Sequence, residues 1–482
     1  MLFNSIDFVI FLPLVFILYW FVTHKNLRLQ NFLIVLASYV FYGWWDWRFL
    51  SLIIFSTLVD YAVGRLLKKE NNNKKRKLLL WLSILVNLGF LGFFKYYNFF
   101  IDNFVSAFSF LGQDIQPNSL NIILPVGISF YTFQTLSYTI DVYQRKLEPT
   151  KDFIAFAAFV SFFPQLVAGP IERASNLLPQ FYKKRKFVYA QAVCGCRQIL
   201  WGLFKKIVIA DNCAEYADQI FNNSGELNGS SLVLGAVFFT FQIYGDFSGY
   251  SDIAIGTARL FGFNLMQNFA FPYFSRDIAE FWRRWHISLS TWFRDYLYIP
   301  LGGSRVSTML KVRNVFIIFI VSGFWHGANW TFIAWGALNA IYFLPLLLTR
   351  NNRNHLAIVA EGKLFPNLKE FASIILTLAL TVLAWVFFRA ENIAHAVNYI
   401  SEIFSTSILS IPNFEGRLLA IKIIGLIIIF IIVEWLERDQ QFALQKLGTT
   451  WKRPYRYLLY YTVFFSILWY AGREQEFIYF QF

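Results

Sequence analysis

The chain has 482 residues, of which 57% are hydrophobic and 15% are charged. Soluble domains typically contain about 45–50% apolar and about 25% charged residues, so this composition excludes an ordinary soluble protein and indicates a membrane protein. The net charge of +14 does not indicate nucleic-acid binding, because the basic residues lie in short loops between apolar runs.

The apolar runs predict a polytopic helical protein. A membrane-spanning helix needs roughly 17–25 mainly apolar residues. Candidate spans, some of them short, are 6–22, 31–43, 49–64, 78–94, 121–143, 191–210, 231–244, 314–324, 330–348, 371–388, 418–435 and 457–470. The first run lacks a basic leader and a small-residue cleavage site, so we expect a retained helix rather than a signal peptide. We predict an all-α membrane protein with about twelve spans.

The charges of the loops predict the orientation. Loop 65–77 carries seven Lys or Arg and one Glu, whereas residues 211–230 contain four acidic residues and no Lys or Arg. Basic loops stay in the cytoplasm, so the first loop is placed inside and the second outside. Alternation then places the basic segments 183–186, 276–313, 350–369 and 438–456 inside. We expect a multi-pass protein of the inner (plasma) membrane.

The middle of the chain is less regular. Pro125 and Pro164 interrupt apolar runs, and such broken backbone persists at membrane depth only inside protein or beside a cavity. Segment 121–181 is therefore expected to contain re-entrant or tilted pieces. Residues 244–252 form a polar, glycine-spaced break whose carboxylates, on Asp246 and Asp252, need partners. The nearest candidates are Arg259 and the arginines of the next segment.

Residues 271–300 are too charged to cross lipid. They are expected to form an interfacial amphipathic helix or a helix folded into a cytoplasmic funnel. His286 lies here beside Arg283 and Arg284, which disfavour its protonation, so it is a candidate for binding or proton handling. The two arginines suit an anionic donor, because guanidinium binds phosphate bidentately. They also suit lipid headgroups, toward which long basic side chains extend.

His326 lies between two apolar runs, 314–324 and 330–348, and is flanked by Trp325 and Trp330. An ionisable side chain at membrane depth is by default a functional candidate. Desolvation favours the neutral imidazole, which is the form that a general base requires. The alternative is a buried histidine that is hydrogen-bonded to a neighbouring helix.

Other chemistries have little support. The three cysteines, Cys194, Cys196 and Cys213, show no spacing typical of a disulfide framework or a zinc site, so no metal is expected. A nucleophile-elbow serine motif, a phosphate-binding loop and a dinucleotide-binding fingerprint are all missing from the sequence.

Four motifs, the opening segment Met1–Tyr19 and a segment near the end of the sequence together resemble the membrane-bound O-acyltransferase (MBOAT) family, especially its alginate O-acetyltransferase (AlgI-like) branch. The similarity covers nearly the whole chain. The motifs are Phe163-Pro164-Gln165-Leu166-Val167-Ala168-Gly169-Pro170-Ile171, Asp246-Phe247-Ser248-Gly249-Tyr250-Ser251-Asp252, Phe281-Trp282-Arg283-Arg284-Trp285-His286-Ile287-Ser288, Phe324-Trp325-His326-Gly327 and the closing Phe477-Ile478-Tyr479-Phe480.

The resemblance implies a single MBOAT domain over 1–482, with N-terminal helices to 120, a catalytic core over 121–345 and C-terminal helices from 346. It implies a tunnel that joins both membrane faces, with His326 as the catalytic histidine and His286 as the second histidine of the family. The further residues expected along the donor path or tunnel are Arg283, Arg284, Trp285, Trp325, Asn329, Asp246 and Ser248.

The expected function is transfer of an acetyl group from a cytoplasmic donor, acetyl-CoA, for O-acetylation of an exported polysaccharide such as alginate or peptidoglycan. Expected partners are membrane lipid, a separate periplasmic or extracellular SGNH-type acetyltransferase, and the polysaccharide acceptor. No bound cofactor is expected. The alternatives are D-alanyl transfer to teichoic acid from a carrier protein, and export of an envelope precursor by a transporter, which broken helices also suit.

Overall fold

The computed structural model describes residues 1–110, 120, 122–167, 169–472, 475 and 477–478. These residues form helices, turns and loops without a strand among them, which confirms the all-helical prediction. The chain divides into two compact units: unit 1 comprises Met1–Gly195 and Thr257–Met266, and unit 2 comprises Cys196–Gly256 and Gln267–Phe482. The expected organisation as one domain, with boundaries near residues 120 and 345, stays a prediction.

Unit 1 contains the helices before residue 196. Its helices are α1 (Ile6–Ile17) with a π-helical extension (Leu18–Val22), α2 (Leu27–Gly43), a 3-10 turn (Trp47–Phe49), α3 (Leu50–Lys69), α4 (Asn73–Leu91) with a π-helical extension (Gly92–Tyr96), α5 (Tyr97–Phe110), α6 (Ile128–Tyr143), α7 (Phe153–Ser161), α8 (Phe163–Leu166), α9 (Ala174–Leu177), a 3-10 turn (Leu178–Tyr182) and the start of α10 (Tyr189–Leu203). The short pieces α7, α8 and α9 confirm the expected interruption of segment 121–181.

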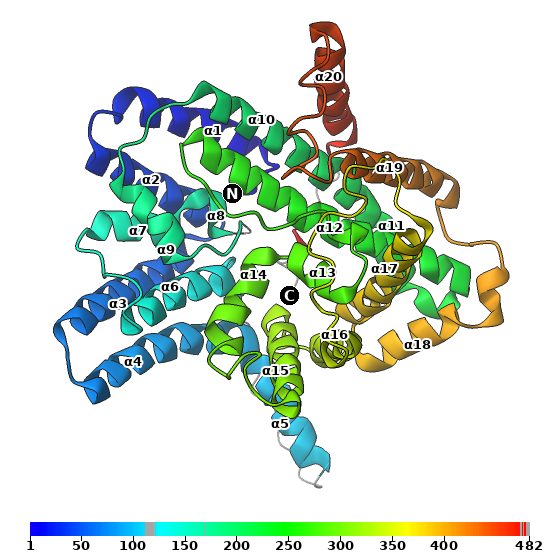
Figure 1. Cartoon of the computed structure of the whole chain (residues 1–482), viewed down its shortest axis with the longest axis horizontal. Coiled ribbons are helices and arrows are strands. Elements are labelled where there is room, and N and C mark those ends of the chain that lie inside the picture. The colour runs from blue at the N-terminus through cyan, green and yellow to red at the C-terminus, as the bar shows by residue number, and fades with distance from the viewer. Residues whose placement is uncertain (111–119, 121, 168, 473–474, 476, 479–482) are drawn as a thin grey trace. The chain divides into compact units, whose positions relative to one another are not determined.

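A buried carboxylate joins three helices of unit 1. Helices α3, α4 and α6 lie side by side (Figure 1). Asp60 of α3 accepts hydrogen bonds from Ser83 and Asn87 of α4 and from Thr139 of α6, the last two at 2.9 Å. Polar side chains that bond across apolar helices stabilise their association by about 1 kcal/mol each. This network holds the three helices in register.

Unit 2 contains the remaining helices and both candidate histidines. Its helices are the end of α10, a π-helical segment (Phe204–Ala210), α11 (Asp211–Asn222), a 3-10 turn (Ser224–Glu226), most of α12 (Gly229–Leu260), a 3-10 turn (Pro272–Phe274), α13 (Ile278–Arg284), α14 (Ile287–Phe293), a π-helical segment (Arg294–Tyr298), α15 (Thr308–His326), α16 (Trp330–Leu348), α17 (Leu368–Arg389), α18 (Ile393–Ile403), a 3-10 turn (Thr406–Leu409), α19 (Arg417–Leu436) and α20 (Arg453–Tyr470).

Two glycines allow α15 and α16 to pack closely as a hairpin. A Cβ atom added at Gly323 of α15 would lie 2.1 Å from the carbonyl oxygen of Phe332, and one at Gly336 of α16 would lie 2.3 Å from that of Phe319. Small residues permit this close backbone approach between apolar helices. Because His326 is the last residue of α15, the contact also fixes the position of its backbone relative to α16.

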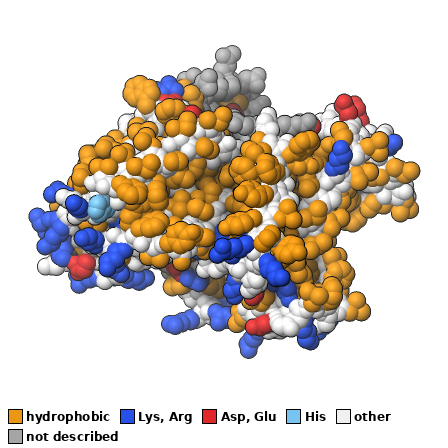
Figure 2. Space-filling model, turned by 90° about the horizontal axis from the view of Figure 1, so that it is seen from above, with side chains coloured by type: hydrophobic (Ala, Val, Ile, Leu, Met, Phe, Trp, Pro, Cys, Tyr) orange, Lys and Arg blue, Asp and Glu red, His pale blue; other side chains and the backbone are white. Residues whose placement is uncertain are grey.

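Seven helical segments among the described residues are long and apolar enough to cross a membrane. They are Trp47–Lys69, Asn73–Phe110, Gly229–Leu260, Thr308–His326, Trp330–Leu348, Leu368–Arg389 and Arg417–Leu436. Hydrophobic side chains cover much of the surface shown in Figure 2. On α19, for example, Leu418 is 75% exposed and Ile421 is 61% exposed, as expected of a lipid-facing helix. The larger count of about twelve spans stays a prediction.

The predicted break at residues 244–252 is wrong, because α12 continues without interruption from Gly229 to Leu260. The partners of its carboxylates were also misassigned. Asp246 pairs with Lys206, and Asp252 pairs with Lys205. These lysines lie in a run that was expected to be an ordinary span. Each carboxylate is paired with a lysine of the neighbouring segment. The polar residues can therefore be buried within one long helix without interrupting it.

Segment 271–300 folds as short helices, α13 and α14, followed by the π-helical segment Arg294–Tyr298. None of the seven long apolar helices of the described chain includes it, in line with the expectation that it does not cross. A compact ion-pair group stabilises α13: Glu280 accepts hydrogen bonds from Arg276 at 3.0 Å and from Arg284 at 3.0 Å. Glu280 is almost fully buried, and its two partners hold the pKa of the carboxyl below its ordinary value despite that burial.

Candidate active site

His326 lies in an aromatic enclosure at the end of α15. Its ring centroid lies 4.9 Å from Trp325, 5.2 Å from Trp335 of α16 and 5.2 Å from Phe388 of α17. The residue is only 4% exposed. The helix ends here because Gly327 is extended, and Asn329 caps α16 by accepting a hydrogen bond from the Thr331 N–H. Apolar walls of this kind exclude water from the ring.

His286 is buried in a polar setting between α13 and α14. Its Nδ1 lies 3.1 Å from Oδ1 of Asn268. The same oxygen accepts the Ser288 hydroxyl at 2.9 Å and the Ser288 N–H at 3.3 Å. An oxygen that accepts these bonds requires Nδ1 to donate, which makes Nε2 the acceptor nitrogen of the ring. Burial lowers the pKa of His286 to about 3, so the ring is neutral at physiological pH.

The backbone of His286 is strained. Its φ of 43° lies in the left-handed region, which residues other than glycine rarely adopt. The Ile287 N–H donates to the Asn268 carbonyl at 2.9 Å, and the Asn268 amide donates to Ser251 of α12 at 3.0 Å. Residues held in such a conformation persist only when their surroundings impose it, so Asn268 fixes both the backbone and the ring.

One tryptophan links the two histidines. Trp325 contacts His326 at 4.9 Å and His286 at 6.2 Å between ring centroids. The structure therefore brings both predicted histidines and Trp325 into one cluster. Trp285 joins the same cluster less directly: it packs against Trp385 at 5.0 Å, which in turn stacks on Trp335. Asn329, which was also predicted to lie along the donor path, caps α16 and donates to the Glu391 carbonyl at 2.8 Å.

Asp246 lies in a buried ion triad. Lys206 lies 2.8 Å from Asp246 and 2.8 Å from Asp211. The triad also holds the end of the chain, because Asp246 accepts the Ile478 N–H at 2.7 Å and Lys206 donates to the Gln475 carbonyl at 3.1 Å. Residues Ala168, Tyr479 and Phe480 of the quoted motifs lie outside the described residues. Lys206 was missed from the sequence, where only its position in an apolar run gave a signal.

Phe247 connects this triad to His286. It follows Asp246 in α12 and meets the His286 ring edge-on at 4.5 Å. It also contacts Phe477 at 6.1 Å. The next residue, Ser248, is 1% exposed within α12. The predicted roles of Asp246 and Ser248 along a tunnel stay predictions; the contacts described make Asp246 an anchor of the His286 surroundings.

Arg283 and Arg284 point to backbone and carboxylate partners. Arg283 donates to the carbonyl oxygens of Asn352 and His355, both at 2.8 Å. Arg284 donates to Glu280 at 3.0 Å and to the Ala270 carbonyl at 3.2 Å. Neither arginine lines the cavity described next, and their predicted contact with the donor stays a prediction.

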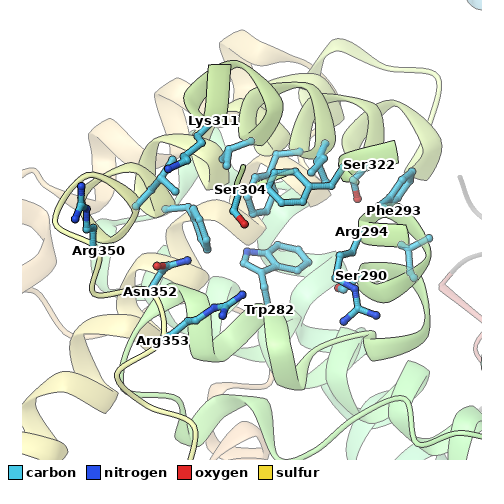
Figure 3. A pocket seen from close by; sticks show the side chains of 17 residues that line it. Trp282, Ser290, Phe293, Arg294, Ser304, Lys311, Ser322, Arg350, Asn352 and Arg353 are labelled. Atoms are coloured by element: carbon cyan, nitrogen blue, oxygen red, sulfur yellow. The ribbon is translucent and has the colours of Figure 1, made fainter. Parts of the chain in front are cut away.

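A cavity of about 500 Å³ lies between α13, α14, α15, α16 and the loop after α16. Figure 3 shows Lys311, Arg350 and Arg353 on one side of it and Ser322 on the other, with Trp282 between them. Ser322 lies one helical turn before His326 on α15. Trp282 reaches the histidine enclosure through Trp335, with ring centroids 5.6 Å apart.

The charge of the cavity has one sign. Among the described residues that line it are four Arg or Lys side chains and no Asp or Glu. The four are Arg294, Lys311, Arg350 and Arg353. Such a lining favours an anionic ligand, and guanidinium groups bind phosphate bidentately. The sequence placed these residues only in the basic segments 276–313 and 350–369, which are expected on the cytoplasmic side. Nothing in the sequence showed that these two segments meet.

Comparison with known proteins agrees with this site. Residues 142–388 match the model of MBOAT, the membrane-bound O-acyltransferase family. The chain is 43% identical to the probable alginate O-acetylase AlgI of Pseudomonas aeruginosa, over 84% of this chain and 75% of that protein. It is 37% identical to the peptidoglycan O-acetyltransferase of Helicobacter pylori, over 82% of this chain and 78% of that protein.

A more distant relative is the teichoic acid D-alanyltransferase of Streptococcus thermophilus, 29% identical over 50% of this chain and 62% of that protein. The chain belongs to the membrane-bound O-acyltransferase family. It is an acyltransferase whose similarity to O-acetylases extends over most of its length, and it is a multi-pass membrane protein. Family membership confirms the expected enzyme class over the transporter alternative.

Proposed function

We propose that this protein transfers the acetyl group of acetyl-CoA, taken from the cytoplasmic side, to a hydroxyl acceptor for O-acetylation of an exported polysaccharide. The observation that carries the proposal is the cation-lined cavity, whose wall residue Ser322 lies one turn from His326 on the same helix. Phosphates bound near Lys311 and Arg353 would leave the thioester free to extend toward the aromatic enclosure. The printed names of the O-acetylase relatives support acetyl as the group and a glycan as its destination.

In this proposal His326 is the general base. Its neutral imidazole takes the proton of the acceptor hydroxyl while the oxygen attacks the thioester carbonyl carbon. A carbon–oxygen bond forms, the carbon–sulfur bond breaks, and the proton passes to the departing CoA thiolate. General-base catalysis of this kind contributes about 10²–10⁴-fold to the rate. The apolar walls support the role because they limit competing hydrolysis by water.

The orientation follows from the loops. The cavity residues Lys311, Arg350 and Arg353 belong to basic segments that we place on the cytoplasmic side of the inner membrane, within a topology of about twelve crossings. A separate secreted SGNH-type acetyltransferase would receive the group and pass it to the polysaccharide. Labelling of single cysteines introduced into loops 65–77 and 211–230 tests the orientation: only the second should react with an impermeant reagent in intact cells.

The donor is the part of the proposal most open to direct test. Protein reconstituted in lipid vesicles is supplied with acetyl-CoA, with an acetylated phosphopantetheinyl carrier protein or with a D-alanylated one, and labelled acyl transfer is measured. Of the three donors, we expect only acetyl-CoA to give acyl transfer to a hydroxyl acceptor. Transfer only from the D-alanylated carrier would replace acetylation with the D-alanyl alternative, and transfer only from the acetylated carrier would remove acetyl-CoA as the donor.

A further inference from the structure

The cationic side of the cavity depends on a loop with a strained backbone. Arg350 has a φ of 60°, in the left-handed region where glycine or asparagine is usual after a helix. The loop that follows, residues 350–357, carries three cavity residues: Arg350, Asn352 and Arg353. A loop with a costly backbone conformation keeps it only when its neighbours hold it.

Those neighbours are Arg283 of α13 and Arg276, which lies just before that helix. Arg283 donates to the Asn352 carbonyl from one nitrogen and to the His355 carbonyl from the other, so its two bonds lie on either side of Arg353. Arg276 donates to the Ala357 carbonyl at 2.6 Å, farther along the loop. All of these bonds go to backbone oxygens. They therefore determine where the loop runs without occupying the side chains that face the cavity.

The chemistry of this contact requires arginine. A planar guanidinium presents several N–H donors in a fixed fork, whereas a lysine ammonium is a compact point charge on a flexible stem. Arg283 is therefore able to bridge two carbonyls that are three residues apart while Trp282, beside it in α13, lines the cavity. One short helix thus supplies both a wall of the cavity and the clamp on the opposite loop.

We infer that Arg283 is a positioning residue for the anionic donor: it clamps loop 350–357 so that Arg350 and Arg353 face the cavity. This rests on the proposed donor site. Arg283 itself does not contact the donor. Its loss should weaken donor binding and leave the chemical step at His326 unchanged, because the loop is remote from the histidine along α16.

The test measures kcat and KM for acetyl-CoA in reconstituted full-length protein with Arg283→Ala, Arg283→Lys, Arg353→Ala and the double variant. We expect Arg283→Ala to raise KM about as much as Arg353→Ala, by about fivefold for one lost charge-assisted contact. The value of kcat should stay within about twofold, and Arg283→Lys should fall between the wild type and Arg283→Ala. The double variant Arg283→Ala/Arg353→Ala should raise KM by less than the product of the two single increases, because both substitutions act through Arg353.

Trypsin provides a readout independent of turnover. Cleavage after Arg353 should be faster in Arg283→Ala than in the wild type, with cleavage in the basic loop 65–77 unchanged. If Arg353→Ala raises KM while Arg283→Ala changes neither KM nor the cleavage rate, the clamp is refuted and the donor site stands. A fall in kcat at constant KM for Arg283→Ala also refutes it. If neither Arg353→Ala nor Lys311→Ala affects KM, the donor site is wrong and the inference is lost with it.

Discussion

His326 and His286 are both buried imidazoles in unit 2, but their surroundings differ in kind. Aromatic rings surround both imidazoles, and His286 in addition is held by an amide, a hydroxyl and a left-handed backbone. Both histidines lie one turn from a residue that lines the cavity, His326 from Ser322 and His286 from Ser290, so they differ in what surrounds each ring. The comparison teaches that burial alone does not identify a catalytic base. A base needs access to its substrate, while a histidine with a fixed tautomer is suited to orientation.

The largest effect is expected at His326. His326→Ala should reduce O-acetyl ester content in cells by at least about 10²-fold, the lower end of general-base contributions, with normal amounts of protein in the membrane. His24 is exposed and provides the matched control, since His24→Ala should retain full acetylation. Ester content is measured by base hydrolysis and acetate assay. Comparable losses of ester content in His326→Ala and His24→Ala would show that the effect is not specific to His326.

The ion triad supports the His286 side of the comparison. Lys206→Met leaves the Asp246 and Asp211 carboxylates buried without their shared cation, which should cost about 3–5 kcal/mol of stability. Thermal unfolding in detergent measures the loss. Lys74→Met, at an exposed position, should change stability by less than about 0.5 kcal/mol. An unaltered melting temperature for Lys206→Met would show that the triad does not anchor this region.

The pH dependence of stability should carry the signature of His286. The folded chain keeps the ring neutral down to a pKa of about 3, whereas the unfolded chain protonates it below its ordinary value of 6.5. The stability it contributes is therefore complete above pH 6.5 and is lost as the pH falls toward 3. At pH 5 the loss is about 2 kcal/mol relative to pH 8.

The non-titrating variant His286→Asn retains a donor near the Nδ1 position and tests this assignment. Between pH 8 and pH 5 its stability should decline by about 2 kcal/mol less than that of the wild type, measured by denaturant unfolding at each pH. Parallel pH profiles for the two proteins would show that His286 titrates normally in the folded chain.

The smallest effect is expected at Lys311, on the side of the cavity opposite Ser322 (Figure 3). Lys311→Ala should raise KM for acetyl-CoA by about fivefold and leave kcat unchanged, because one phosphate contact at a partly open site is worth about 1 kcal/mol. The KM difference between wild type and variant should shrink at high salt. A fall in kcat without a change in KM would place Lys311 in the chemical step instead.

Much of this site was predictable from the sequence. The remainder could not be predicted, and the reasons are physical. Apolar runs and loop charges predicted a helical membrane protein, and the isolation of His326 in an apolar run singled it out. The partners of Asp246 and Asp252 were wrong because Lys205 and Lys206 are adjacent to them only in the folded chain. The cavity was missed for the same reason: Lys311 at the start of α15 and Arg353 in the loop after α16 are far apart in the sequence, and each alone looks like an ordinary inside charge.

The most direct test of the central claim, that His326 is the base, is a single-turnover measurement with purified protein, labelled acetyl-CoA and a hydroxyl acceptor. We predict that His326→Ala binds acetyl-CoA with unchanged affinity but forms the acetyl ester at least about 10²-fold more slowly. His286→Asn should lose much less. Ester formation by His326→Ala at the wild-type rate would contradict the account.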